Sequence, residues 1–163
     1  MRSTIASLES EYHRYKLLAE ASFHQLTEEQ LAEPGNEAVN SVATIAWHVS
    51  GNLKSRFTDF LTTDGEKPWR DRKAEFEPRR VTHGELLRHW EEGWQALFHT
   101  LSDLDDGSLA RSVVIRDHPL SVAEALHRSL AHVSYHVGQI VFMAKAMRGA
   151  EWEYLSIPPG QSE

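Results

Sequence analysis

The sequence predicts an all-α protein, a four-helix bundle with a long crossover between its second and third helices. Three observations lead to this prediction. Apolar residues recur at three-and-four spacing in four long stretches. Capping signals precede these stretches, and turn-forming residues separate them. With 163 residues, of which 40% are apolar and 25% charged, the chain is long enough for one compact domain, which we expect to span residues 1–163.

The first helix is predicted over residues 4–25, with Ser3 as its N-cap. A capping box, Thr27-Glu28-Glu29-Gln30, opens one further turn, and Pro34-Gly35-Asn36 ends it. The apolar face of the first helix consists of Ile5, Leu8, Tyr12, Tyr15, Leu18, Ala19 and Phe23.

The second helix is predicted over residues 41–62, with Asn40 or Ser41 as its N-cap. His48 lies at the border of its apolar face. This position fits two interpretations, a half-exposed histidine and a polar group that reaches into a pocket between helices. The apolar face itself consists of Val42, Ile45, Ala46, Val49, Leu53, Phe57, Phe60 and Leu61.

Residues 63–81 interrupt the helical pattern with turn signals such as Asp64-Gly65 and Lys67-Pro68. Two large aromatic residues, Trp69 and Phe76, stand among charged residues in this segment. A loop of this length is expected either to cover a functional site as a partly ordered flap or to cross the surface between helices.

The third helix is predicted over residues 82–102, opened by a capping box that starts at Thr82. Trp90 and Trp94 face inward and are expected to anchor the core. The short β-branched run that follows, with a turn at Asp117-His118-Pro119, is consistent with a two-stranded ribbon before the fourth helix.

The fourth helix is predicted over residues 121–148, between a capping box at Ser121 and the stop residue Gly149. Residues 151–163 carry several large apolar side chains, and we expect this tail to fold back onto the bundle.

His132 and His136 lie four residues apart on the fourth helix, so their imidazoles project from one face, one turn apart. This is the spacing of a metal clamp. With 10 histidines in 163 residues, chance alone gives about 0.6 such pairs, so the spacing by itself is weak evidence. The apolar residues that share this face, including Val133 and Ile140, indicate that the pair points inward.

Composition excludes several other functions. The net charge is −7 and no block of Lys or Arg is present, which argues against nucleic acid or an anionic membrane as the partner and favours a small, uncharged or modestly charged ligand. No apolar run has the length of a signal peptide or a membrane span, so we expect a cytoplasmic protein. Because the chain has no cysteine, any metal must be held by nitrogen and oxygen.

The histidine-bearing stretches carry a resemblance to known proteins. Ala46-Trp47-His48-Val49 and His132-Val133-Ser134-Tyr135-His136-Val137-Gly138-Gln139-Ile140 resemble the DinB/YfiT-like superfamily of metalloenzymes. The strings Leu61-Thr62-Thr63-Asp64-Gly65-Glu66-Lys67-Pro68-Trp69 and Leu155-Ser156-Ile157-Pro158 are similar to a DinB-like subgroup of bacterial proteins without a settled activity. The resemblance spans nearly the whole chain.

The resemblance implies a DinB-like bundle, a homodimer and a divalent metal bound by His48, His132 and His136. Some superfamily members are transferases or isomerases that use bacillithiol or mycothiol. Three neutral imidazoles leave coordination positions open, which suits a reactive site. Imidazole binds zinc, nickel and iron, and a tetrahedral site favours zinc.

Two classes of function are consistent with the sequence. One is a metal-dependent transferase or hydrolase that acts on a small molecule. The other is a non-enzymatic, dimeric helical bundle that binds a metal or a ligand. Asn52 and Gln139 stand near the proposed ligands, where each could hydrogen-bond to water or substrate or make an ordinary polar contact within the bundle.

Overall fold

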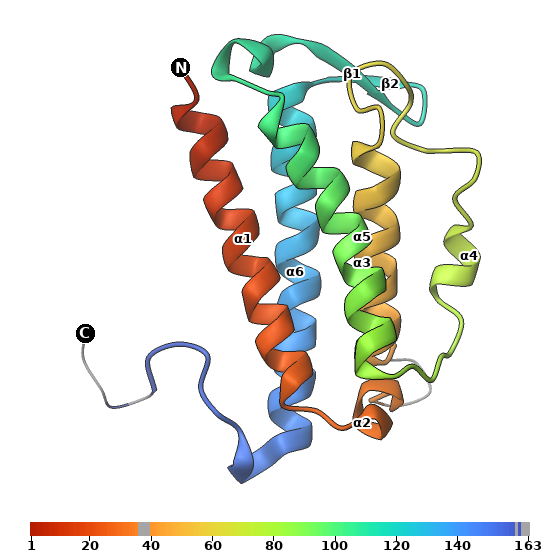
Figure 1. The fold of residues 1–163 in the computed structure, drawn as a ribbon, viewed down its shortest axis with the longest axis vertical. Coiled ribbons are helices and arrows are strands. Elements are labelled where there is room, and N and C mark those ends of the chain that lie inside the picture. Colours follow the sequence, from red (N-terminus) through yellow and green to blue (C-terminus); the bar gives the residue numbers. More distant parts are fainter. Residues whose placement is uncertain (36–39, 159, 161–163) are drawn as a thin grey trace.

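The computed structural model of the protein describes residues 1–35, 40–158 and 160, and it is mostly helical (Figure 1). Asn36 of the predicted stop signal, and Pro159 and residues 161–163 of the tail, lie outside the described residues. The described residues form helices α1 (Ser3–His24), α2 (Glu28–Ala32), α3 (Val42–Phe57), α4 (Arg72–Glu75), α5 (His83–Ser102) and α6 (Val122–Arg148), 3-10 helices η1 (Asp106–Ala110) and η2 (Gly149–Glu151), and strands β1 (Ser112–Ile115) and β2 (His118–Ser121).

Four long helices, α1, α3, α5 and α6, lie side by side along the molecule (Figure 1). Helix α3 packs against α5 and α6, and α1 packs against α6 and α5. Helices α1 and α6 run away from the β1–β2 ribbon, whereas α3 and α5 run toward it (Figure 1). Helices α3 and α6, which carry the three candidate histidines, are therefore antiparallel neighbours.

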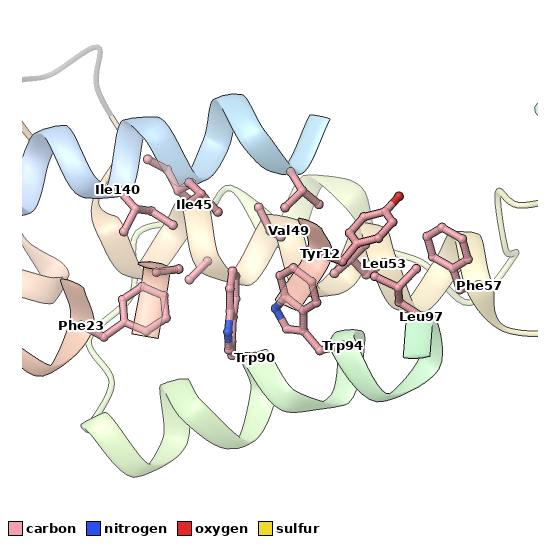
Figure 2. Close-up of a cluster of buried hydrophobic side chains, with 14 of the residues drawn as sticks. Tyr12, Phe23, Ile45, Val49, Leu53, Phe57, Trp90, Trp94, Leu97 and Ile140 are labelled. Carbon is pink, nitrogen blue, oxygen red and sulfur yellow. The ribbon is translucent and has the colours of Figure 1, made fainter. Parts of the chain in front are cut away.

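The core lies between these four helices and is centred on the two tryptophans of α5 (Figure 2). Trp90 and Trp94 are fully buried, as the sequence predicts. The ring of Phe23 meets Trp90 edge-on with 5.3 Å between ring centroids, and Tyr12 meets Trp94 in the same manner at 6.4 Å. Aromatic contacts of this geometry join α1 to α5.

The starts of most helices are set by local side chains. Thr27, Thr82 and Ser121 each form the predicted capping box, in which the hydroxyl accepts from the N3 backbone N–H and the N3 side chain accepts from the cap residue. Ser41 caps α3 by accepting from the backbone N–H of Thr44. Helices α1, α5 and α6 begin and end within one residue of their predicted bounds.

The prediction that Ser3 caps the first helix is wrong. Ser3 is itself the first helical residue, and no side chain at Arg2 caps the helix. Instead, the carboxylate of Asp106, at the start of η1, accepts from the backbone N–H groups of Thr4 and Ile5 at 3.0 and 3.1 Å. A negative group at a helix N-terminus is favourable wherever it comes from in the sequence.

The second helix is shorter than the predicted 41–62, because α3 ends at Phe57. Thr58 still donates its N–H to Lys54, but its backbone is extended, and Asp59 has a positive φ of 49°. Phe60 is nonetheless buried. The apolar period therefore continues into a non-helical turn, which is why the pattern overstates the helix.

The connecting segment, residues 58–82, runs from the end of α3 to the start of α5 and contains the short helix α4 (Figure 1). It is fixed to the predicted β-ribbon, which the structure confirms. The Asp64 carboxylate accepts from the backbone N–H groups of Arg116 and Asp117, and Gly65 donates to the carbonyl of Val114 at 2.8 Å. The ribbon turn consists of Arg116 and Asp117, both with positive φ, rather than the predicted residues 117–119.

The tail returns to the helices at Trp152, whose side chain is buried. Gln25 at the end of α1 exchanges two hydrogen bonds of 2.9 Å with the backbone of Glu153. Leu155 also packs against the core, whereas Tyr154 and Ile157 are exposed, so the described part of the tail packs in part as predicted. Among the described residues, none of the helices combines the length and apolar character needed to cross a membrane.

Candidate metal centre

Three histidines from two helices meet at one point between α3 and α6. His48 comes from α3, and His132 and His136 come from successive turns of α6. One ring nitrogen from each lies within 4.8 Å of the other two, and the Nε2 atoms of His48 and His132 are 3.2 Å apart. The residues that the sequence and the resemblance single out are thus brought together, and the group could hold a metal ion.

His48 is buried rather than half-exposed, with 4% of its surface accessible. Its Nδ1 is 2.8 Å from Oε2 of Glu75, a residue of α4. Arg70 donates to both oxygens of the same carboxylate, at 2.7 and 2.8 Å. The ring of Phe76 covers His48 with 4.5 Å between ring centroids. A proton on Nδ1 donated to Glu75 leaves the lone pair of Nε2 directed at the other two histidines.

The close approach of Glu75 depends on the absence of a side chain at Gly51. A Cβ atom at this position of α3 would lie 2.5 Å from Oε1 of Glu75. Glycine in the middle of a helix costs roughly 0.5–1 kcal/mol relative to alanine. Here it leaves the space in which the carboxylate reaches His48.

The two histidines of α6 differ in how their outer nitrogens are held. Nδ1 of His136 is 2.8 Å from the side-chain oxygen of Gln139, so Nδ1 carries the proton and Nε2 is left as a ligand. Nδ1 of His132 is buried and has no hydrogen-bond partner among the described residues. Two of the three histidines are therefore oriented by an oxygen acceptor. The acceptor is the carboxylate of Glu75 for His48 and the side-chain amide of Gln139 for His136.

Both histidines of α6 are poor bases in the folded protein. Burial lowers the pKa of His132 to about 3, and the electrostatic interactions that a protonated His132 would make with His136, His48 and Arg70 lower it further. Burial also lowers the pKa of His136 to about 4, against the hydrogen bond to Gln139. For Glu75, burial raises the pKa, but the hydrogen bonds from His48 and Arg70 outweigh burial. The pKa of Glu75 is therefore lowered, and the carboxylate is ionised. Neutral imidazoles beside an ionised carboxylate are the protonation states that metal binding requires.

The spacing of the His48 and His132 nitrogens fits a small divalent ion. Two nitrogens at adjacent corners of a tetrahedron around zinc, each about 2.0–2.1 Å from it, lie about 3.3–3.4 Å apart. The 3.2 Å between Nε2 of His48 and Nε2 of His132 is close to that value. With three protein ligands such a site keeps at least one coordination position for another molecule.

A cavity of about 320 Å³ opens beside the three histidines, between α3, α4, α6 and the ribbon turn. Its apolar lining includes Phe57, Phe60 and Phe76. Asn52 also lines it, one turn beyond His48, whereas Gln139 is engaged with His136. The volume lies at the lower end of the range for small-molecule sites.

The site also contains Glu75, Arg70 and Gly51, which the sequence alone does not single out. Glu75 and Arg70 belong to the connecting segment, so this segment contributes side chains to the site. A glycine three residues after His48, inside a helix, was the one local signal of a close approach. The remaining histidines stand elsewhere; His13 stacks on Phe98, for example.

Comparison with known proteins places the chain in a family. No curated protein matches it. A family model described as "Protein of unknown function (DUF1572)" matches residues 2–161, nearly the whole sequence. The chain therefore belongs to the DUF1572 family.

Proposed function

We propose that the protein is a metal-dependent enzyme, a transferase or hydrolase that acts on a small molecule at a divalent ion held by His48, His132 and His136. The supporting observation is that three imidazoles converge at the edge of an open cavity, two of them with Nδ1 held by an oxygen acceptor. A purely structural ion is usually enclosed by four protein ligands, whereas three ligands beside a cavity suit an ion that meets a substrate.

Zinc is the proposed metal, because three imidazoles at this spacing suit tetrahedral coordination; nickel and iron are the alternatives. When bound, such an ion supplies a Lewis acid that polarises an oxygen or stabilises a thiolate of the reacting molecules. A low-molecular-weight thiol as co-substrate follows from the DinB-like resemblance. The role of the chain is to fix the imidazoles: Glu75 orients His48, Gln139 orients His136, and Phe76 shields the His48 ring from solvent.

The same proposal covers the architecture around the site. We propose that the four long helices form a DinB-like four-helix bundle of one domain, with the connecting segment as its crossover. Since α3 and α5 run in the same direction, the chain has to return along the bundle between them (Figure 1). A cytoplasmic homodimer completes the proposal; the exposed aromatic residues Tyr135 and Phe142 on α6 are consistent with such an association.

The test is a metal analysis of purified protein and of matched variants. We expect close to one divalent ion per chain in the wild type. The His132→Ala, His136→Ala double variant should lose it, and His48→Ala should bind it more weakly. His99→Ala is the control, because His99 is highly exposed at the end of α5. Stoichiometric metal in the double variant would refute the proposed site.

Enzymatic action is tested separately on the metal-loaded protein. Low-molecular-weight thiols paired with electrophiles, and a panel of ester and amide substrates, test the transferase and hydrolase alternatives. Turnover in the wild type that is lost in the double variant supports the enzyme proposal. A protein that binds the ion but converts none of these substrates would favour the non-enzymatic, ligand-binding alternative.

A further inference from the structure

The cavity beside the histidines is lined by positive charge. Four arginines line it, and none of the described lining residues is Asp or Glu. This contrasts with the whole chain, whose net charge is −7. The four are Arg56, Arg72, Arg116 and Arg128.

Three of the four arginines lie toward the ribbon end of the cavity. On α6, Arg128 lies one turn before His132, on the same face, and therefore about 6 Å nearer the ribbon. On α3, which runs antiparallel to α6, Arg56 lies two turns beyond His48, again toward the ribbon, at about 12 Å (Figure 1). Arg116 belongs to the ribbon turn itself. Arg56, Arg116 and Arg128 thus lie toward the ribbon end of the cavity, whereas the histidines lie farther from it.

Two of the arginines already have a carboxylate partner within the protein. Arg56 and Arg116 share the carboxylate of Glu66, at 3.0 and 2.8 Å. By contrast, among the residues that the structure describes, neither Arg72 nor Arg128 has an ion-pair partner. The guanidinium of Arg72 stands over the ring of Phe76, 5.1 Å from its centroid, and Phe76 in turn covers His48. Positive charges that line one cavity without a carboxylate partner favour the entry of an anion, which gains binding energy there.

We infer that the substrate is a small molecule with an anionic oxygen group, a carboxylate or a phosphate, which Arg72 and Arg128 bind while its reactive end reaches the three histidines. This inference rests on the proposed function, because it takes the histidines as the reactive end. Guanidinium groups suit this task, since their planar fork of donors matches the oxygens of carboxylate and phosphate. Phe57, Phe60 and Phe76 would then contact the apolar part of the molecule between the two ends.

The test measures anion binding to metal-free protein, so that the probe cannot bind to the ion. Inorganic phosphate is titrated calorimetrically at low ionic strength, where screening is weakest. The variants are Arg72→Gln, Arg128→Gln and the double variant, with Arg88→Gln as the matched control because Arg88 is exposed on α5, away from this cavity. The affinity for acetate is compared with the affinity for acetamide, a neutral molecule of nearly the same shape. The difference between the two affinities reports the effect of charge rather than of size.

We expect the double variant to bind phosphate at least about tenfold more weakly than the wild type, and Arg88→Gln to stay within about twofold. Arg128→Lys should retain part of the affinity, because it keeps the charge without the fork. Acetate should bind more tightly than acetamide. Equal phosphate affinity in the wild type and the double variant would overturn the inference.

Metal content is measured on the same variants to keep the two proposals apart. If Arg72→Gln and Arg128→Gln bind one ion per chain but phosphate affinity does not depend on the arginines, the anion inference fails and the metal site stands. If no variant and no wild-type sample binds an ion, the proposed function fails. If phosphate affinity still depends on the two arginines in that case, the result would support an anion site without a metal reaction beside it.

Discussion

The orientation of His48 depends on a carboxylate from a different segment of the chain. Glu75 is 6% exposed and receives hydrogen bonds from both His48 and Arg70. A carboxylate behind a metal-binding histidine fixes the tautomer and makes the ring a stronger ligand. Because Arg70 neutralises the buried carboxylate, Glu75 can stay ionised at this depth, which its lowered pKa reflects.

Replacing Glu75 with Gln is expected to weaken metal binding by about 10- to 100-fold, the usual effect of removing such a partner. The amide oxygen can still accept from His48 but carries no negative charge, so the ring becomes a weaker ligand. Competition with a chromogenic chelator measures the change in affinity. Glu77→Gln is the control, since Glu77 is an exposed residue of the same segment. An affinity equal to that of the wild type in Glu75→Gln would show that the carboxylate does not act on the site.

At the scale of elements, α3 and α5 approach each other closely at Gly93. A Cβ atom at Gly93 would lie 2.5 Å from the backbone oxygen of Ser50 and 2.7 Å from its Cα. The hydroxyl of Ser50 donates to the carbonyl of His89 and accepts from the N–H of Gly93 at 3.2 Å. The absence of a side chain at Gly93 allows α3 to lie against α5 at the height of the histidine cluster.

Gly93→Ala is expected to destabilise the protein by about 1–3 kcal/mol, because the added methyl group meets backbone rather than a flexible side chain. The change should appear as a lower midpoint in urea unfolding with little change in slope. Gly84→Ala, near the start of the same helix, is the matched control. Its Cβ would meet only the end of the Arg88 side chain at 3.7 Å, so its stability should be unchanged or higher. Equal stability of the two variants would contradict this account of the α3–α5 contact.

The elements that the sequence predicts well are those set by neighbouring residues. Thr82 and Ser121 cap their helices through partners three residues away, so the start of each helix can be read locally. The end of α3 at Phe57 cannot be predicted from neighbouring residues, because Phe60 continues the apolar period although it lies in a turn. The cap of α1 comes from Asp106, about 100 residues away, and no local pattern reveals it.

The residues of the candidate site also differ in how well the sequence predicts them. Helical spacing and the apolar residues on the same face point to His132 and His136, whereas spacing leaves His48 open and only the resemblance joins it to the pair. Glu75 is separated from His48 by 27 residues and reaches it only through the path of the connecting segment. Side chains placed by tertiary packing of a loop carry no periodic signal.

At the scale of the whole molecule, the site exists only when the fold is complete. Its residues come from α3, the connecting segment and α6, and the unfolded chain holds none of them together. Folding also buries two histidines with pKa values of about 3 and 4, well below the ordinary value of 6.5. The stability of the metal-free protein is therefore linked to pH through these groups.

Acidification is expected to destabilise metal-free protein already between pH 6.5 and 5. In this range the unfolded chain binds a proton at His132 and at His136, whereas the folded protein does not, so falling pH favours unfolding. Carboxylates with lowered pKa, such as Glu75 and Glu66, act in the same direction, but only as the pH approaches their ordinary value of 4.5 and falls below it.

Thermal unfolding in the presence of a chelator, at several pH values, measures the effect. The His132→Gln, His136→Gln double variant should show a flatter dependence that retains the contribution of His89, whose pKa burial also lowers. The same slope in the wild type and the double variant would show that the two histidines are not held neutral by the fold.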